Sequence, residues 1–308
     1  MIIDLFPESP SSIPRGVGIQ VHNSCNSRCI MCGYRHTHKK HPYQRISMGS
    51  FTKIIDEFLG LDIKRFSLSL QCEALHDPDI FERIKYIKSS GGFCGISTNG
   101  LLLTSKTTDK LGEYGLDILA VSLNALSEEM FEYVHGVEGF DNYENNIIYA
   151  IENKPANQFI AFNSMLVKKN YSQLKSKKHK IFDLIEKHNI KSRMGPIGNH
   201  CGSLPSYSEL VIVPEEQSST KKLYCHDIFE SVYILSDGSI IGCCSDYRRK
   251  YILGNIKNQR FVDIWNDRKT QKRRHDMMYR NLYELEPCKD CSQAWNIMRN
   301  RGIKSAEE

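Results

Sequence analysis

The chain has 308 residues, 40% of them hydrophobic and 10% aromatic, which is enough for one large α/β domain with an appendage or for two domains. Its formal net charge of +5 is small, so we expect no nucleic-acid partner. The N-terminus lacks the basic start of a secretory signal, and no apolar run approaches the ~20 residues of a membrane span. We therefore expect a cytoplasmic protein without membrane contact, whose eleven cysteines indicate metal binding or catalysis rather than disulfides.

Three of these cysteines, Cys25, Cys29 and Cys32, stand close together directly after an apolar stretch that predicts a strand over about 17–22. Three thiolates can hold three irons of a four-iron cluster and leave the fourth iron open to a small molecule. A structural zinc site or a closed cluster would instead need a fourth ligand. Three nearby histidines could provide that ligand: His22, His36 and His38. The spacing alone leaves both kinds of site open.

Apolar periodicity predicts alternating strands and helices along the first 190 residues. Helices are expected over about 48–59, 79–88, 104–114, 127–134, 143–152 and 181–188, and strands over about 66–70, 93–98, 118–123 and 159–167. The charged, His-rich stretch 35–45 is expected to form a loop. This alternation is typical of βα units around a parallel sheet, which binds ligands at the carboxyl ends of its strands. Polar residues follow several of these strands: Glu73, Asn99 with Gly100, and Ser122 to Asn124.

The Cys-x3-Cys-x2-Cys spacing resembles the signature of the radical S-adenosylmethionine (radical SAM) superfamily, although Met31 replaces the aromatic residue that usually precedes the third cysteine. The resemblance implies an α/β fold, a partial (β/α)6 TIM-like barrel over 17–192 that follows an N-terminal extension over 1–16. It also implies a 4Fe-4S cluster that binds S-adenosylmethionine and receives electrons from a flavodoxin- or ferredoxin-like donor. The implied ligands of this cluster are Cys25, Cys29 and Cys32.

Further family motifs appear in order along the chain. The Gly-Gly-Glu-Pro-like motif of the family corresponds to residues 71–74, where the glycines and the proline are lost and Glu73 is kept. In the family this acid helps to hold the amino group of S-adenosylmethionine. The strand ends 97–100 and 122–124 match the segments that contact the ribose and the methionine carboxylate. The cofactor-binding residues that the resemblance implies are Glu73, Ser97, Asn99, Ser122 and Asn124.

The sequence changes in character after Arg193, where glycines and prolines up to Pro205 predict a linker. A β-hairpin is expected around Asp237-Gly238, and a basic helix is expected to end near Tyr279. The basic clusters 175–180, 248–250 and 272–274 are expected to lie on the solvated surface. Four more cysteines can close the shell of a zinc ion or of an iron–sulfur cluster: Cys225, Cys243 (or Cys244), Cys288 and Cys291.

This region resembles the SPASM/Twitch extension of radical SAM enzymes, in its single-cluster Twitch form. The resemblance implies a small β-hairpin/helix domain over 193–308 that holds an auxiliary 4Fe-4S cluster. The implied ligands are Cys225, Cys243, Cys288 and Cys291. Some radical SAM epimerases also carry a free cysteine near the auxiliary cluster that returns a hydrogen atom to the substrate radical. Cys244, and after it Cys201, are the candidates for this catalytic thiol.

The resemblance implies reductive cleavage of S-adenosylmethionine to a 5′-deoxyadenosyl radical that abstracts hydrogen from an unactivated C–H bond. Family members with a Twitch extension include an aminocyclitol dehydrogenase and aminoglycoside epimerases. We therefore expect an oxidoreductase or epimerase that acts on a sugar- or cyclitol-like natural-product precursor. One alternative is epimerisation or crosslinking of a ribosomal peptide, so the substrate is a small molecule or a peptide. An alternative of another class is a non-enzymatic zinc or iron–sulfur interaction protein.

Overall fold

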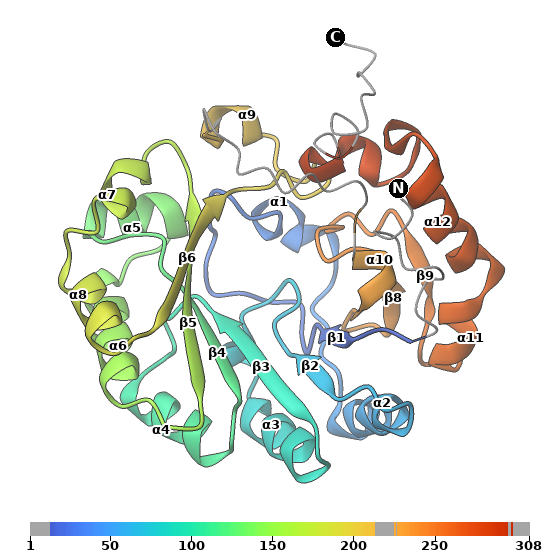
Figure 1. Cartoon of the computed structure of the whole chain (residues 1–308), viewed down its shortest axis with the longest axis horizontal. Coiled ribbons are helices and arrows are strands. Elements are labelled where there is room, and N and C mark those ends of the chain that lie inside the picture. The colour runs from blue at the N-terminus through green and yellow to red at the C-terminus, as the bar shows by residue number, and fades with distance from the viewer. Residues whose placement is uncertain (1–12, 213–224, 226, 295–296, 298–308) are drawn as a thin grey trace, which may run out of the picture.

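The computed structural model describes residues 13–212, 225, 227–294 and 297. Its centre is one sheet of nine strands in the order β6-β5-β4-β3-β2-β1-β7-β8-β9, within this described part (Figure 1). The strands are β1 (Gly16–Ile19), β2 (Arg65–Ser67), β3 (Phe93–Thr98), β4 (Ile118–Ser122), β5 (Phe159–Leu166), β6 (Lys191–Pro196), β7 (Ser231–Ile234), β8 (Ser239–Ile241) and β9 (Ile252–Asn255).

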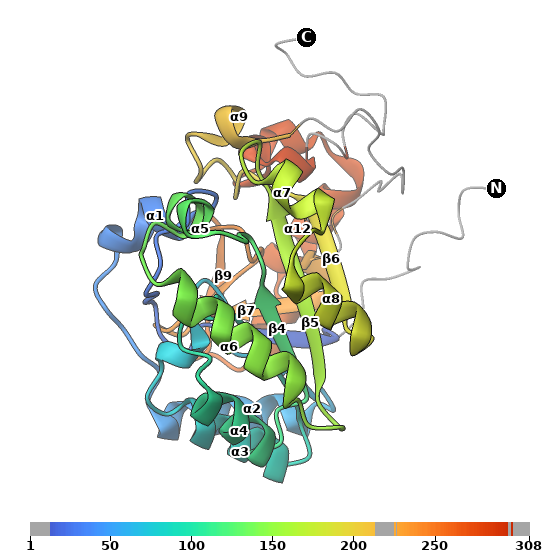
Figure 2. The same cartoon turned by 90° about the vertical axis from the view of Figure 1, so that its left-hand side faces the viewer.

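The first six strands are all parallel, and their connecting helices lie along the outer face of the curved sheet (Figures 1 and 2). The helices of this half are α1 (Tyr34–Thr37), α2 (Met48–Gly60), α3 (Ile80–Ser89), α4 (Ser105–Glu113), α5 (Glu128–His135), α6 (Phe140–Glu152), α7 (Tyr171–Ser176), α8 (Lys180–Lys187) and α9 (Tyr207–Leu210). Among the strands of the described residues the sheet does not close, because β6 and β9 are its two edges. The expected partial barrel of βα units is therefore confirmed.

The two faces of the barrel strands differ in character. Ile96, Val121 and Phe162 belong to the buried core that the strands share with the outer helices. Side chains alternate along a strand, so the residues between them face the inside of the barrel. Most inner residues in the middle of these strands are small or polar, namely Gly95, Ser97, Ala120, Ser122, Ala161 and Asn163, whereas Ile118, Phe159 and Met165 on the same face are large and apolar. The inner face is thus suited to enclose a polar ligand rather than to pack a core.

The C-terminal strands continue the barrel sheet, which the sequence did not indicate. Strand β7 pairs in parallel with β1, and β8 and β9 follow in antiparallel order. Gly18 allows this close pairing, since a Cβ there would lie 2.9 Å from the ring of Tyr233. The helices of this half are α10 (Asp227–Glu230), α11 (Phe261–Asn266) and α12 (Arg268–Tyr279). They pack on the sheet and on a second core that contains Ile228, Met277 and Leu282.

Several local expectations need correction. The linker expected after Arg193 begins later, because β6 continues to Pro196. The stretch 35–45 contains the short helix α1 and a 3-10 turn over His38–Lys40, so it is only in part a loop. The strand expected over 66–70 is limited to Arg65–Ser67.

The basic cluster 272–274 is not uniformly solvated. Arg273 and Arg274 are only 5% and 1% exposed. The guanidinium of Arg274 lies 3.9 Å from the ring centroid of Trp265 and donates to the backbone carbonyls of Ile228 and Trp265. Charge patterning missed this, because a buried arginine bonded to carbonyls looks the same in sequence as a solvated one. Among the described residues, no helix has the length and apolarity that crossing a membrane requires.

Candidate active site

The loop that carries Cys25, Cys29 and Cys32 leaves the carboxyl end of β1 and is held from the side by the end of α5. The backbone N–H of Arg28 donates to the carbonyl of His135 at 2.9 Å, and that of Ile30 donates to Val134 at 2.9 Å. Gly136 ends α5 with φ +66°, and a Cβ there would lie 2.8 Å from the carbonyl oxygen of Arg28. Glycine is thus required at this position both for the backbone conformation and for the close approach of the loop.

The end of β3 is bonded to the same loop through Asn99. Its Nδ2 donates to Asn26 Oδ1 at 2.7 Å and to Ser27 Oγ at 3.0 Å, and it lies 3.9 Å from the sulfur of Cys25. Glu73, which follows β2, accepts from the backbone N–H of Asn99 at 2.8 Å through Oε2. The structure therefore brings two of the sequence-predicted cofactor residues, Glu73 and Asn99, into one network beside Cys25.

The other three predicted cofactor residues lie on neighbouring strand ends. Ser97 and Ser122 face the inside of the barrel on β3 and β4. Asn124, just beyond β4, accepts from the backbone N–H of Met165 through Oδ1 at 2.8 Å and is only 5% exposed. Its amide oxygen therefore already holds the end of β5 in place.

Burial raises the pKa values of the acid and of the three thiols of this site. Desolvation raises the pKa of Glu73, and it raises the pKa of Cys25 to about 12. Burial also raises the pKa values of Cys29 and Cys32. Thiols with raised pKa values become ligands when a bound metal centre displaces their protons. The donor set therefore fits a metal cluster better than it fits free nucleophiles.

Two of the three nearby histidines, His22 and His38, are already bonded to other groups. His22 is fully buried; its Nε2 bonds the carbonyl of Glu73 at 3.0 Å, and its Nδ1 lies 2.9 Å from Ser24 Oγ. The ring of His38 bonds the backbone carbonyls of Tyr34 and Arg35. No three thiols of the described chain lie within 4.8 Å of one another, whereas sulfurs around one zinc ion are roughly 4 Å apart. At least one pair of the three sulfurs of this loop is therefore farther apart than the sulfurs around one zinc ion.

Two side chains that the sequence did not single out contact the thiols of this loop. His135 Nδ1 lies 3.9 Å from the sulfur of Cys29. Burial lowers the pKa of His135 to about 4, so the ring is neutral near pH 7. Tyr247, from the C-terminal half, places its hydroxyl oxygen 3.5 Å from the sulfur of Cys32. Neither contact could be predicted from the spacing of residues in the sequence, because each partner lies more than 100 residues from its cysteine.

The predicted auxiliary cysteines line one cavity of about 250 Å³ in the C-terminal half. Six thiols border it: Cys201, Cys225, Cys243, Cys244, Cys288 and Cys291. Arg273 donates to the sulfur of Cys288 at 3.1 Å, which adds a positive charge beside a thiolate ligand set. The cavity therefore combines the number of soft ligands and the charge that an auxiliary iron–sulfur cluster requires.

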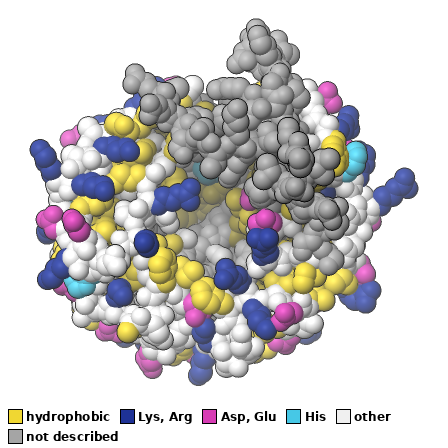
Figure 3. All heavy atoms as spheres, in the orientation of Figure 1, with side chains coloured by type: hydrophobic (Ala, Val, Ile, Leu, Met, Phe, Trp, Pro, Cys, Tyr) yellow, Lys and Arg dark blue, Asp and Glu magenta, His cyan; other side chains and the backbone are white. Residues whose placement is uncertain are grey.

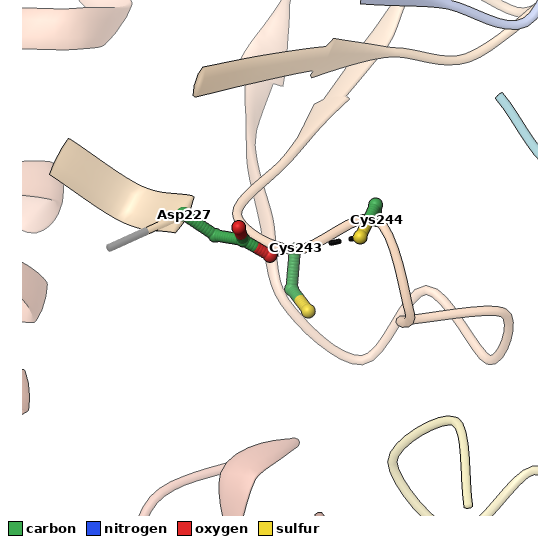
Figure 4. Close-up of side chains that lie close together, drawn as sticks. All are labelled: Asp227, Cys243 and Cys244. Atoms are coloured by element: carbon green, nitrogen blue, oxygen red, sulfur yellow. Dashed lines mark hydrogen bonds between the residues drawn. The ribbon is translucent and has the colours of Figure 1, made fainter. Parts of the chain in front are cut away.

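The two candidate catalytic thiols both border this cavity and both contact the thiol of Cys243. Cys201 is 2% exposed, and its thiol contacts the thiols of Cys243 and Cys291. The thiol of Cys244 lies 3.6 Å from a carboxylate oxygen of Asp227 (Figure 4). These two residues and Cys243 form the one group of metal-binding side chains in the described ranges whose ligand atoms all lie within 4.8 Å.

The geometry of both sites agrees with comparisons to known families. A family model described as the radical SAM superfamily matches residues 19–175, and a SPASM model described as an iron–sulfur cluster-binding domain matches residues 225–292. The first match spans about half of the chain, and the chain therefore belongs to the radical SAM superfamily. Its cofactors are S-adenosylmethionine, the 4Fe-4S cluster that binds it and an auxiliary 4Fe-4S cluster.

Relatives and solved structures of this class resemble most of the chain. The tungsten-containing aldehyde ferredoxin oxidoreductase cofactor-modifying protein of Pyrococcus furiosus is 23% identical over 312 residues, which cover 89% of this chain and 86% of that protein. The structure of BtrN in complex with AdoMet and 2-DOIA has a TM-score of 0.61 at 17% identity, over 91% of this chain and 93% of BtrN. The structure of Streptococcus suis SuiB bound to precursor peptide SuiA has a TM-score of 0.67 at 15% identity, over 93% of this chain and 71% of SuiB. At these identities the two structures show a shared fold.

Proposed function

We propose that this radical SAM enzyme abstracts a hydrogen atom from an unactivated C–H bond of a sugar- or cyclitol-like natural-product precursor, and that it oxidises or epimerises that substrate. The inner face of the barrel carries this proposal. Near the carboxyl ends of the strands it presents the hydroxyl group of Ser67 and the amide group of Asn163. Small polar side chains of this kind can exchange hydrogen bonds with a ring that bears several hydroxyl groups.

The space for such a substrate is formed by residues small enough to leave room. Gly95, Ala120 and Ala161 lie between the polar side chains on the same face. The face of the molecule in Figure 3 is hollowed near its centre, with lysine and arginine side chains around it. Arg193, which pairs with Asn163 across β5 and β6, adds a cation at this edge of the barrel. An electronegative substituent on the substrate would suit that position.

When bound, S-adenosylmethionine and its cluster supply a 5′-deoxyadenosyl radical, and the chain itself supplies position and protection from water. Asn99 fixes the cysteine loop relative to β3, as the bonds to Asn26 and Ser27 show. Glu73, buried beside that loop, is proposed to accept from the amino group of S-adenosylmethionine. Ser97, Ser122 and Asn124 are proposed to lie along its ribose and carboxylate.

Cys244 is the better placed of the two proposed hydrogen-donating thiols. Its backbone carbonyl accepts from Gln71 Nε2 at 2.8 Å, so it lies beside the segment that follows β2. Its side chain packs against the small cluster that includes Leu70 and Tyr233, and Tyr233 lies over Gly18 of β1. Cys201 is 2% exposed and contacts two auxiliary thiols, those of Cys243 and Cys291, whereas Cys244 contacts that of Cys243. This supports Cys243 as the cluster ligand and Cys244 as the thiol that returns hydrogen in an epimerisation.

The proposal is tested with anaerobically reconstituted protein, dithionite and S-adenosylmethionine. Aminocyclitols and amino sugars deuterated at ring carbons are offered beside ribosomal precursor peptides deuterated at their α-carbons. Deuterium in 5′-deoxyadenosine from the ring substrates supports the proposal. Deuterium only from the peptides would overturn it in favour of peptide modification.

The thiol is tested in the same assay with D2O as solvent. Cys244→Ala is expected to form 5′-deoxyadenosine from substrate but to lose solvent deuterium from the epimerised carbon. Cys94→Ala, which replaces a buried cysteine of β3, is the matched control and is expected to retain solvent deuterium at the epimerised carbon. Full turnover by Cys244→Ala would remove this thiol from the mechanism.

A further inference from the structure

Tyr247 joins the two cysteine sites. Its hydroxyl oxygen lies 3.5 Å from the sulfur of Cys32, and its ring covers the next residue of the loop, Gly33. A Cβ at Gly33 would lie 2.7 Å from that ring, so the glycine is what allows the tyrosine to reach the sulfur. The side chain of Tyr247 thus contacts the first cysteine loop in two ways, through its hydroxyl at Cys32 and through its ring at Gly33.

The position of Tyr247 is set by the auxiliary half of the chain. It follows Cys243 by four residues, on a turn that Asp246 fixes by accepting from the backbone N–H groups of Lys250 at 3.1 Å and Tyr251 at 2.9 Å. Asp246 is 1% exposed, so this turn is held in the interior. A change in the position of Cys243 would therefore be transmitted over one short, rigid turn to the hydroxyl at Cys32.

His200 makes a second contact between the auxiliary half of the chain and the first cysteine loop. The ring of His200 meets that of Tyr247 edge-on with centroids 5.2 Å apart, and its Nε2 lies 3.0 Å from the carbonyl oxygen of Met31. His200 precedes Cys201, which borders the auxiliary cavity. Both contacts to the first loop are therefore made by residues close in sequence to auxiliary thiols, since Tyr247 follows Cys243 by four residues and His200 precedes Cys201.

We propose that Tyr247 is a positioning residue which donates a hydrogen bond to the Cys32 thiolate and so makes the first cluster easier to reduce, coupling its reduction potential to the folding of the auxiliary site. Reduction adds negative charge to a cluster, and hydrogen bonds to its sulfurs stabilise that charge. The inference rests on the first cluster of the proposed function and is independent of the substrate. His135 at Cys29 comes from α5 and does not depend on the auxiliary site.

The test is a reductive titration of reconstituted protein, followed by electron paramagnetic resonance and made without S-adenosylmethionine or substrate. Tyr247→Phe removes the hydroxyl and keeps the ring over Gly33. We expect about a tenfold smaller equilibrium constant for one-electron reduction of the first cluster, which is about 59 mV towards more negative potential. The auxiliary cluster is expected to keep its potential. Tyr279→Phe is the matched control, because Tyr279 is 71% exposed, and it is expected to leave the reduction potentials of both clusters unchanged.

A second variant separates the hydrogen bond from the ring. Gly33→Ala keeps the hydroxyl but pushes the phenol away from Cys32, so it is expected to shift the same potential in the same direction. An unchanged potential in Tyr247→Phe with full iron content would overturn the proposal. Loss of the first cluster's iron in that variant would also overturn it, because Tyr247 would then hold the cluster rather than set its potential. Wild-type protein without a first cluster would contradict the proposed function itself.

Discussion

Asp77 is expected to be one of the most sensitive positions for stability. Its carboxylate accepts from Arg83 Nε at 2.6 Å, and both side chains are fully buried. Arg45 approaches the other carboxylate oxygen at 3.2 Å, and Arg83 also lies over the ring of Phe51. The pair holds the segment after Glu73 against α3, so its loss would also loosen one wall of the candidate active site.

The expected magnitude follows from burial. Asp77→Ala leaves the Arg83 guanidinium charged in the interior, and breaking a buried pair in this way costs about 3–5 kcal/mol. A whole protein has a free energy of unfolding of only about 5–15 kcal/mol, so this single change removes a large share of it. Asp62→Asn is the matched control, because Asp62 and Lys64 form an equally short pair, also 2.6 Å, whose side chains are 80% and 59% exposed, and because asparagine tolerates the positive φ of 61° at this position.

The assay is urea unfolding of the metal-free protein. We expect Asp77→Ala to lower the free energy of unfolding by several kcal/mol and Asp62→Asn to leave it nearly unchanged. Adding Arg83→Met to Asp77→Ala removes the unpaired charge and should recover part of the loss. Equal effects of the two single variants, or no recovery in the double variant, would refute the reasoning from burial.

Two further predictions concern the cysteine loop. Gly136→Ala should destabilise the protein and weaken iron binding, because the new Cβ meets the carbonyl of Arg28. Gly91→Ala, at φ +81° with open space around it, should show only the conformational cost of about 1–2 kcal/mol in the same urea assay; equal losses would contradict this. Burial lowers the pKa of His22, so the unfolded chain binds more protons below about pH 6.5, and stability should fall from pH 7 to pH 5. His22→Gln should flatten this slope, and an unchanged slope would show that His22 does not titrate on unfolding.

Much of the fold follows from local patterns that the sequence displays. Alternating apolar segments predicted five of the six parallel strands but not β6, and a helix was correctly expected over 127–134, where Ser127 caps α5 by accepting from the N–H of Met130. Asp237-Gly238 correctly predicted the turn between β7 and β8. These features depend on residues close together in the chain, where propensity and spacing act directly.

Contacts between distant segments could not be predicted in this way. The pairing of β7 with β1 depends on Gly18 meeting Tyr233, and nothing in either segment alone specifies the other. Likewise, His135 and Tyr247 reach the thiols of Cys29 and Cys32 only because the fold brings remote elements to one edge of the sheet. Sequence motifs identified the groups that could bind iron, but not the side chains around them.

The most direct test of the account is the iron and sulfide content of the anaerobically reconstituted protein, followed by addition of S-adenosylmethionine and dithionite. The account predicts about eight irons, as in two four-iron clusters, and formation of 5′-deoxyadenosine. Cys29→Ala should lose about half of the iron and all of the 5′-deoxyadenosine. Cleavage that persists in this variant, or wild-type protein that holds iron and never cleaves S-adenosylmethionine, would contradict the assignment of Cys25, Cys29 and Cys32 as the site of radical chemistry.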